Sequence, residues 1–585
     1  MIQRRAPPRP RRPPPETNWA ALGFTAVFAV IVVLAFGIES KRCHELVVWS
    51  SNEKSSLLKS IADAYAPPDV ERRCVRVVVE RVPSGDAEIA LRRGEAINGQ
   101  LPHVWSPAAN SWARLLIQHR TESGLRDIVP VARRSLINSP LVIAMPQKLY
   151  NTLRECRAEI GWAYILELAR DPHVCPLYTA QWGRFRLAKT DPTVSTSGLH
   201  ALISTYNAGV GTTGTLSLEE IRRGYVQSFV RGVEASVLHY GDSVGNFLET
   251  LYAEDQRGAA LKYVSAIAVE EKQVFDYNRG RSGPCPPCVP PVERLVAVYP
   301  DEGSLIADHP YIILSADWVH SAHQQAALNF RDHLEREDIQ QRFLKDGFRN
   351  IDLDGLSDVL TAPYFQMTEP RLTVTFSPPA VLAEMQASWF DLRKRANILL
   401  VFDIAESMTR EIGNQRVTKL ELVKSATSNA LKKLNPEDAV GLWTISTRPG
   451  EAYRELVPVE SIGSSDTIGP ALAGLQAGTG GRLLYATVRA SVDRLRSQFA
   501  ADRIDAVVVV SNGDDDRPGS SEFFALLDYL RDQPEDERIR VFTIAYDESA
   551  KEALGQIALA SKGRSYDASN PLDITRVLRE VISNF

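Results

Sequence analysis

Apolar runs alternate with amphipathic stretches along most of the chain, which has 585 residues. Between residues 45 and 360, segments such as LVVW, VRVVVERV, PLVIAMP and RLVAVYP have the length and β-branched content of strands. Others, such as SSLLKSIADAYA, carry apolar residues at helical spacing. This alternation predicts an α/β fold with a mostly parallel sheet, where ligands bind at loops leaving the carboxyl ends of strands.

The pattern changes after residue 360. A proline-bearing connector, residues 361–396, ends in an amphipathic helix whose Leu382, Met385, Trp389 and Leu392 fall on one face. After it, NILLVF, AVGLWTIS, IDAVVVVS and RVFTIAY are continuous apolar runs separated by helical patterns. Such strands belong to a parallel sheet that is covered on both faces. Residues 397–585 are therefore predicted to form one doubly wound domain.

The N-terminus carries a membrane signal. Residues 19–38 are uncharged and apolar, and as a helix they would span about 30 Å, the thickness of a bilayer core. The preceding residues 1–18 hold five arginines and are predicted to form a disordered basic tail that stays cytoplasmic. We expect an uncleaved single-pass anchor in the cell membrane, with the bulk of the chain extracytoplasmic. A cleaved signal peptide is the alternative, because Ala35 and Gly37 could form a small-residue cleavage site.

Composition adds two constraints. The net charge of −5 arises from 67 basic and 72 acidic residues, so no global field recruits nucleic acid. All six cysteines precede residue 300, and an even count in an exported region predicts disulfides. Nearest-neighbour pairing is one of several possibilities, and it would join Cys43 to Cys74, Cys156 to Cys175 and Cys285 to Cys288. Zinc is disfavoured because the single C-x-x-C has no second pair and no histidine motif nearby.

Two loops gather hydroxyl groups before predicted helices. SSNEKSS, residues 50–56, leaves a strand and opens a helix, and KTDPTVSTSG, residues 189–198, precedes LHALISTYNA. Hydroxyls and unpaired N–H groups at a helix N-terminus can hold an oxyanion or a polyol. Helix capping alone is the alternative interpretation of either loop.

Together with YGDSVG, EEKQVFDYNRG and YPDEGSLIADHPY, these loops resemble bacterial extracellular solute-binding proteins of the two-lobed, molybdate-binder-like kind. The resemblance covers about residues 45–355, and we expect the domain to span residues 43–360. It implies two α/β lobes joined by crossing strands, with a small solute or anion in the cleft between them. The residues expected to line this cleft are Ser50, Ser51, Ser106, Thr196, Ser197 and Tyr277.

The segment GDSVG, residues 241–245, offers an enzymatic alternative. It matches the G-x-S-x-G nucleophile elbow around Ser243, and Asp308 and His309 follow in the order of a hydrolase triad. Asp308 and His309 are adjacent, however, whereas the acid of a triad must orient the histidine across space, and no HGGG-like oxyanion segment is present. A surface serine hydrolase is therefore the second hypothesis, and a non-catalytic protein is the first.

The last domain resembles the von Willebrand factor A family. That family reads as a strand ending D-x-S-x-S-M, a GGT-x-LY loop, a strand ending T-D-G, a helix with L-x-x-I-A and a final G-x-x-Y. This chain has DIAESM, GGRLLY, SNG, LGQIALA and GRSY at the corresponding places. The resemblance implies a doubly wound, Rossmann-like fold over residues 397–585 that engages a protein partner.

The metal-binding positions of that family are altered here. The resemblance implies a divalent cation held by oxygen ligands, for which magnesium is suited. Asp403 and Ser407 are retained, whereas Ala405 replaces a serine, Arg482 a threonine and Asn512 an aspartate. We therefore expect a degenerate metal site that does not bind magnesium tightly, with the guanidinium of Arg482 taking over the electrostatic task of the ion.

The combined pattern resembles actinobacterial chains that join a substrate-binding module to a von Willebrand A domain. We expect a membrane-anchored, extracytoplasmic and non-catalytic protein without a cofactor, which captures or senses a solute and engages a protein partner. A structural scaffold in which both modules have lost their ligands is a further alternative.

Overall fold

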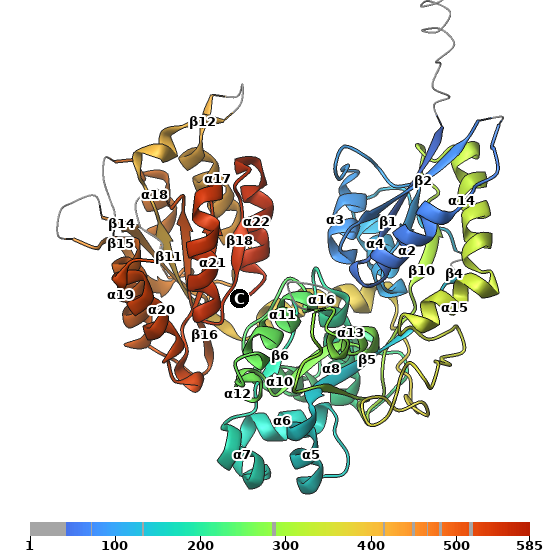
Figure 1. The fold of residues 1–585 in the computed structure, drawn as a ribbon, viewed down its shortest axis with the longest axis horizontal. Helices are drawn as coiled ribbons and strands as arrows, with labels where there is room; N and C mark the ends of the chain where they lie inside the picture. Colours follow the sequence, from blue (N-terminus) through green and yellow to red (C-terminus); the bar gives the residue numbers. More distant parts are fainter. Residues whose placement is uncertain are drawn as a thin grey trace, which may run out of the picture.

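The computed structural model describes residues 43–585 except 72, 132–133, 283–287, 413–415, 447–450, 465, 479–482 and 514–518. Figure 1 shows three bodies: a first lobe in blue and yellow-green, a second lobe mainly in cyan and green, and a C-terminal domain in orange and red. The predicted tail and anchor, residues 1–18 and 19–38, lie outside the described residues. Within the described part, no helix is both long and apolar enough to cross a membrane.

Lobe 1 is built on a five-stranded mixed sheet in which β1 pairs in parallel with β2 and with the central strand β3. Its strands, in sheet order, are β2 (Val75–Arg81), β1 (His44–Ser50), β3 (Val104–Ser106), β10 (Pro310–Ile313) and β4 (Arg134–Ser135). Its helices are α2 (Asn52–Ala64), α3 (Ser84–Arg93), α4 (Asn110–Glu122), α14 (Ser321–Leu334) and α15 (Glu337–Lys345). The carboxyl ends of β1 and β3 meet at one edge of this sheet.

Lobe 2 surrounds a second sheet, whose central strand β5 runs antiparallel to β7, β8 and β9. The strands are β6 (Leu187–Ala188), β7 (Ala266–Glu270), β5 (Ser139–Pro146), β8 (Leu295–Val298) and β9 (Ile306–Ala307). The helices are α5 (Gln147–Cys156), α6 (Trp162–Arg170), α7 (Pro176–Trp182), α8 (Thr196–Val210), α9 (Leu218–Ile221), α10 (Gly224–Glu234), α11 (Val244–Asp255), α12 (Ala260–Tyr263) and α13 (Glu271–Asn278).

The prediction of a mostly parallel sheet is therefore wrong for this region. Both sheets are mixed, because the chain passes between the lobes through β4 and β5 and returns through β9 and β10. A strand that arrives from the other lobe can enter its sheet in either direction, so alternation of strands and helices does not fix strand direction. The predicted two-lobed α/β organisation is confirmed.

Disulfides fasten both lobes. Cys43 pairs with Cys74 across the starts of β1 and β2, and Cys156 pairs with Cys175 between α5 and α7. Both bonds follow the nearest-neighbour pairing. Cys288 is also disulfide-bonded, and Cys285 lies outside the described residues.

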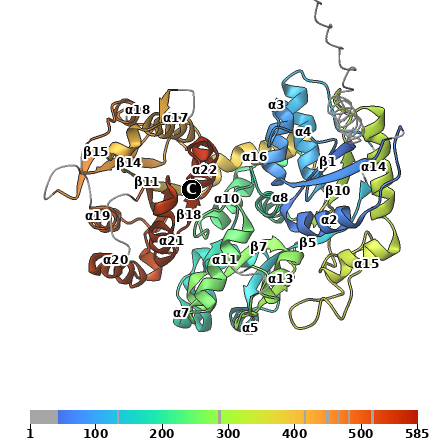
Figure 2. The ribbon, with the colours of Figure 1, turned by 45° about the horizontal axis from the view of Figure 1, so that its top comes forward.

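The connector ends in helix α16 (Pro379–Leu392), which links the two-lobed region to the C-terminal domain (Figure 2). The predicted apolar face is buried, with Leu382 and Met385 fully covered and Trp389 and Leu392 almost so. This face packs against α4 of lobe 1 and against α8 and α10 of lobe 2. The connector helix is thus an integral part of the two-lobed body.

The C-terminal domain, which we call the A domain, has a six-stranded sheet covered on both faces. In sheet order its strands are β15 (Tyr453–Ser461), β14 (Ala439–Ile445), β11 (Arg395–Phe402), β16 (Arg503–Ser511), β17 (Arg540–Ala545) and β18 (Ser565–Asp567). Its helices are α17 (Lys419–Leu431), α18 (Ile468–Ala473), α19 (Leu484–Arg496), α20 (Ser521–Arg531), α21 (Lys551–Ala560) and α22 (Ile574–Ile582).

Alternate residues of β11 face opposite layers of the A domain. Ile398 and Leu400 pack in the cluster that includes α17 and α22, whereas Leu399 and Val401 pack with α19, α20 and α21. Only the edge strand β15 is antiparallel to its neighbour. The predicted doubly wound fold is confirmed.

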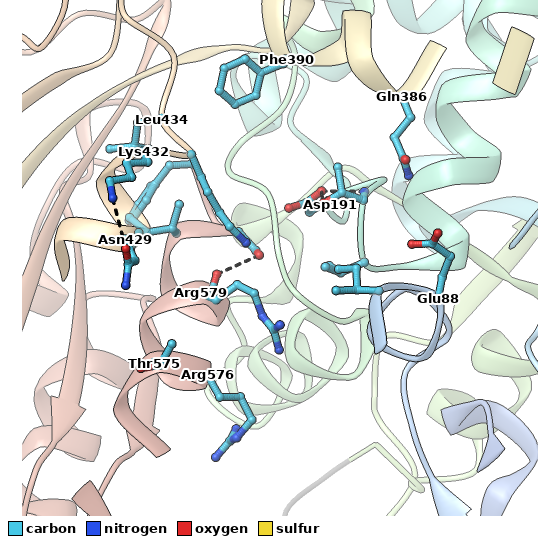
Figure 3. A pocket seen from close by; sticks show the side chains of 18 of the residues that line it. Glu88, Asp191, Gln386, Phe390, Asn429, Lys432, Leu434, Thr575, Arg576 and Arg579 are labelled. Carbon is cyan, nitrogen blue, oxygen red and sulfur yellow. Dashed lines mark hydrogen bonds between the residues drawn. The ribbon is translucent and has the colours of Figure 1, made fainter. Parts of the chain in front are cut away.

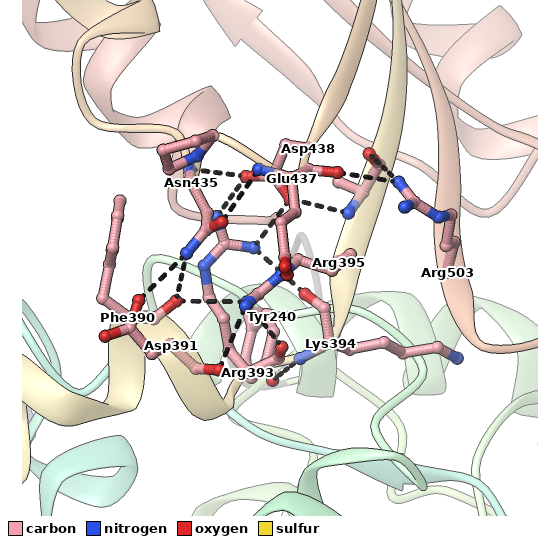
Figure 4. A network of polar contacts seen from close by, with 12 residues as sticks. Tyr240, Phe390, Asp391, Arg393, Lys394, Arg395, Asn435, Glu437, Asp438 and Arg503 are labelled. Atoms are coloured by element: carbon pink, nitrogen blue, oxygen red, sulfur yellow. Dashed lines mark hydrogen bonds and ion pairs between the residues drawn. The ribbon is translucent and has the colours of Figure 1, made fainter. Parts of the chain in front are cut away.

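A buried polar network joins α16 to the A domain (Figure 4). The guanidinium of Arg393 lies 2.5 Å from the Asp438 carboxylate, and both side chains are buried. Asp438 also accepts hydrogen bonds from the backbone N–H groups of Ala396 and Asn435, at 2.9 and 2.8 Å. Tyr240 of lobe 2 accepts a hydrogen bond from the Lys394 backbone N–H at 3.1 Å. The A domain is therefore anchored at its first strand.

Candidate ligand-binding site

The ends of β1 and β3 bring three predicted cleft residues together in lobe 1. Ser50 ends β1, Ser51 precedes the first turn of α2, and Ser106 ends β3. The Ser51 backbone N–H donates to the Ser106 carbonyl at 3.1 Å, and all three residues are buried. The three serines lie together because β1 and β3 are parallel neighbours whose carboxyl ends meet.

Two further predicted residues face this edge from lobe 2. Thr196 and Ser197 form the first turn of α8, and both are buried. The indole N–H of Trp112, in α4 of lobe 1, donates to the Thr196 hydroxyl at 2.9 Å across the cleft. Ser197 donates to the Gln273 side chain at 3.4 Å, next to the end of β7. Five of the six predicted residues thus belong to the two facing walls.

The sixth predicted residue lies elsewhere. Tyr277 is in α13, within the core of lobe 2, where it packs in a cluster with Tyr252 and Phe275. Its hydroxyl is in the electrostatic range of Asp255 and Glu293, and burial raises its pKa. The structure does not bring Tyr277 to the other five residues, because it lies two turns into the helix that leaves the cleft.

A buried lysine occupies the centre of the cleft. The Lys54 ammonium donates to the Ser51 hydroxyl at 2.9 Å and to the carbonyls of Ser106 and Pro107 at 2.8 and 3.0 Å. It also lies 3.3 Å from His309 Nδ1. Lys54 is fully buried, and this burial lowers its pKa to about 7.

His309 continues the chain of contacts from Lys54 into lobe 2. His309 Nε2 lies 3.2 Å from the carboxylate of Glu270, the last residue of β7, and both side chains are fully buried. Burial lowers the pKa of His309 well below its usual range and raises that of Glu270 well above it. We call Lys54, His309 and Glu270 the cleft relay, because the three side chains connect lobe 1 to lobe 2.

Two polar atoms beside the cleft relay have no hydrogen-bond partner within the described structure. They are Glu270 Oε1 and His200 Nδ1, and both residues are fully buried. His200 lies in α8, and its other ring nitrogen is 3.2 Å from the Ser111 hydroxyl of lobe 1. Buried polar groups are nearly always satisfied by protein, water or ligand, so these two atoms are free to bond to a water molecule or to a ligand.

The lobes also touch directly. The Gly85 backbone N–H of lobe 1 donates to the Val194 carbonyl of lobe 2 at 3.2 Å. A Cβ atom at Gly85 would lie 2.5 Å from Val194 Cα, so any side chain there would force the walls apart. The cleft is therefore in a closed conformation.

Sequence reasoning missed the cleft relay. Lys54, Glu270 and His309 each lie within segments that the sequence singled out, yet charged side chains are usually solvated, so nothing local marked them as buried. Only the closing of two lobes, which brings together residues distant in sequence, removes them from water. The one usable signal was that each follows or precedes an apolar run that forms a strand.

The hydrolase hypothesis finds no assembled triad. The two ring nitrogens of His309 contact Lys54 and Glu270. The Asp308 carboxylate accepts hydrogen bonds from Asn110 and Ser135. Ser243 instead precedes α11, next to Asp242, which lies in the electrostatic range of Arg564 of the A domain. Ser243 is thus separated from the histidine and the acid that a nucleophile would require.

In the A domain, the retained metal-site residues are bonded within the protein. Asp403 is buried and accepts hydrogen bonds from the Ala405 backbone N–H at 2.9 Å and from the Ser511 hydroxyl at 2.8 Å. The Asn512 amide N–H donates to the Ser407 hydroxyl. Arg482 lies outside the described residues. Asn512 supplies no negative charge to a cation at this position, unlike an aspartate, and its amide nitrogen is not a metal ligand.

Two closed α/β lobes over a buried polar cleft, followed by a doubly wound A domain, define the class as a two-lobed binding protein. The family model for bacterial extracellular solute-binding proteins matches residues 46–349, just over half of the chain, and the chain belongs to this family. The model for the von Willebrand factor type A domain matches residues 397–580.

The chain is also similar to a curated relative and to solved structures. The Mycobacterium tuberculosis (strain ATCC 25618 / H37Rv) protein named Uncharacterized protein Rv1836c is 25% identical over 488 residues, which cover 80% of this chain and 66% of the relative. This chain thus spans about two thirds of that protein's length.

Among solved structures, the sulfate-binding protein SubI from M. tuberculosis H37Rv is similar over 58% of this chain and 96% of its own, with 13% identity and a TM-score of 0.36. A von Willebrand factor type A protein from Catenulispora acidiphila is similar over 32% of this chain and 42% of its own, with 16% identity and a TM-score of 0.26.

Proposed function

We propose that the chain is a membrane-anchored, extracytoplasmic binding protein without catalysis, which captures or senses a small polar solute between its lobes and engages a protein partner through the A domain. Family membership supports solute binding. The disulfides of both lobes support an oxidising, extracytoplasmic location. The anchor is proposed from residues 19–38 of the sequence alone.

The observation that carries the proposal is the pair of unsatisfied buried atoms beside the cleft relay. Glu270 Oε1 can accept a hydrogen bond or face a cation, and His200 Nδ1 can donate or accept according to its tautomer. The Lys54 ammonium supplies positive charge on the opposite side. A compact solute with both donor and acceptor groups would satisfy this arrangement, and a large apolar one would not.

The test is native mass spectrometry of the full chain purified under gentle conditions. A bound small molecule should be detected with the wild type and lost from Glu270→Gln, which keeps the shape but weakens the acceptor. Glu249→Gln, at an exposed position of α11, is the matched control and should retain the molecule. An empty cleft in wild type and control would instead support the scaffold hypothesis, in which the cleft relay alone holds the lobes closed.

For the A domain, we propose partner binding without a tightly held magnesium ion. The hydrogen bonds of Asp403 and Ser407 within the protein support this proposal. Calorimetric titration of the full chain with Mg²⁺ tests it, and no saturable heat is expected. The variant that combines Ala405→Ser, Arg482→Thr and Asn512→Asp should gain binding. Micromolar affinity in the wild type would refute the proposal.

A further inference from the structure

A second cavity lies where lobe 1, lobe 2 and the A domain meet (Figure 3). Its volume is about 990 Å³, at the upper end of the range for small-molecule sites. Its walls come from α3 of lobe 1, the loop at residues 191–194 of lobe 2, α16, and α17 and α22 of the A domain. No member of the cleft relay lines it, so it is separate from the interlobe cleft.

The charged lining of this cavity is mainly cationic. Lobe 1 contributes Arg92 and Arg93, the connector contributes Arg393 at the end of α16, and the A domain contributes Lys432, Lys433, Arg576 and Arg579. The carboxylates in the wall are fewer, namely Glu88, Glu95 and Asp191. Figure 3 shows Lys432, Arg576 and Arg579 on the side of the A domain and Glu88 on the facing side.

The cations differ in how far they are neutralised. Arg579 lies 3.1 Å from Asp86, and Arg576 lies 2.7 Å from Glu580. Arg92 and Arg93 make longer ion pairs, at 3.9 Å with Glu88 and at 3.8 Å with Glu95. Lys432 and Lys433 have no carboxylate at ion-pair distance anywhere in the described ranges, and the Lys432 ammonium contacts only the Asn429 side-chain oxygen, at 3.4 Å. Two adjacent lysines therefore bring unneutralised positive charge to this space.

Lys433 is exposed at the cavity wall and lies within the electrostatic range of charges from both bodies. Partial desolvation lowers the pKa of Lys433, and the positive charges of Arg579 and Arg93 lower it further, whereas Asp191 and Asp86 act in the opposite direction. Arg93 belongs to lobe 1 and Lys433 to the A domain, so cations from both bodies act on one region. An anion placed between them would relieve this repulsion.

Apolar groups complete the wall. Ile89, Phe390 and Leu572 line the cavity, and Leu572 is 61% exposed despite its size. Exposed apolar side chains beside cations suit a ligand that has an organic body as well as charged oxygens. The Gln386 side chain, which lies beside them, is held by the Pro192 carbonyl at 2.8 Å.

We propose that this cavity binds a soluble, multiply charged oxyanion of the phosphate-ester class, which bridges Lys432 and Lys433 of the A domain to Arg93 of lobe 1. Oxyanions form strong charge-assisted hydrogen bonds with lysine and arginine. Since the two sets of cations belong to different bodies, a bound anion holds lobe 1 against the A domain. The site thereby stabilises the arrangement in which the interlobe cleft is closed.

Isothermal titration of the full chain with inorganic tripolyphosphate tests the site. One saturable event is expected at moderate salt, weakened about tenfold or more in Lys432→Gln/Lys433→Gln, which corresponds to at least about 1.4 kcal/mol. Arg93→Gln, on the opposite wall, should weaken it several-fold. The arginines of the N-terminal tail are unchanged in every variant, so the differences isolate the cavity.

The matched control is Lys59→Gln/Lys262→Gln, which removes the same charge from exposed positions on α2 and α12. Its affinity should stay within about twofold of the wild type, because exposed charges at a distance are screened by salt. Circular dichroism checks that all variants fold. The proposal is overturned if the wild type shows no saturable event, if Lys432→Gln/Lys433→Gln binds as the wild type does, or if the control loses as much affinity.

Discussion

Replacing Lys54 by methionine tests the cleft relay through its pH dependence. Burial lowers the Lys54 pKa to about 7, against an ordinary value of 10.5 in the unfolded chain. Between these pH values the unfolded state binds more protons at this site than the native state, so Lys54 makes the free energy of unfolding rise with pH. One proton corresponds to about 1.4 kcal/mol per pH unit. Titration of Lys54 should therefore raise the free energy of unfolding by about 2 kcal/mol from pH 8 to pH 9.5.

The effect of Lys54 is the difference in the free energy of unfolding between the wild type and Lys54→Met, because other groups of the cleft titrate too. Glu53, Glu270 and Asp308 lie in the electrostatic range of Lys54, and burial raises the pKa of Glu270, which makes stability fall with pH. These carboxylates are present in both proteins. The free energy of unfolding of the wild type minus that of Lys54→Met should therefore increase by about 2 kcal/mol from pH 8 to 9.5.

Urea unfolding followed by tryptophan fluorescence measures this difference. Trp49, Trp105 and Trp112 are buried in the lobe 1 core and report on its unfolding. Lys59→Met is the control, since Lys59 lies on the same helix with its side chain 62% exposed, and its difference from the wild type should not change with pH. A pH-independent difference for Lys54→Met would show that Lys54 stays charged in the native state and would refute the reasoning.

Asp438→Asn leaves the buried Arg393 uncompensated and should lower the free energy of unfolding by about 3–5 kcal/mol in urea titrations. Glu437→Gln, at an exposed ion pair with Arg395, should lower it by less than about 1 kcal/mol. Equal losses of unfolding free energy in the two variants would contradict the role of burial. A fluorophosphonate probe should leave Ser243 unlabelled, and stoichiometric labelling abolished by Ser243→Ala would restore the hydrolase hypothesis. Protease added to intact cells should remove the A domain, and protection of that domain in cells with permeable outer layers would reverse the topology.

Much of the fold could be predicted from the sequence, because the signals were local. Continuous apolar runs such as IDAVVVVS can only be strands buried on both faces, and the structure places Val507 and Val509 against one layer of helices and Val508 and Val510 against the other. The apolar face of α16 followed from helical spacing in the same way. Strand direction in the lobes could not be read, since it depends on how the chain crosses between two bodies.

The candidate site was only partly predictable. Ser50, Ser51, Thr196 and Ser197 were predicted from two loops, because hydroxyls before a helix have a local geometric meaning, whereas Ser106 was predicted through the family resemblance. Lys54, Glu270 and His309 become buried only when two lobes close, and no local pattern distinguishes a lysine in such a relay from a solvated one. The cationic cavity was likewise invisible, because Arg93 and Lys433 are separated by most of the chain.

The A domain is held to the two lobes unequally, and this asymmetry relates the cleft to the domain that is proposed to bind a partner. Its contacts with lobe 2 include a hydrogen bond from the Tyr240 backbone N–H to the Asn584 carbonyl, at 3.0 Å, beside the buried junction at Arg393. An ion pair with lobe 1 joins Arg579 to Asp86, and both side chains are partly exposed. Such pairs contribute little free energy. The A domain is also joined to α16, which packs against α4 of lobe 1 and against α8 and α10 of lobe 2. Separation of the lobes should therefore disturb the packing of α16, so that closure of the cleft and the position of the A domain change together.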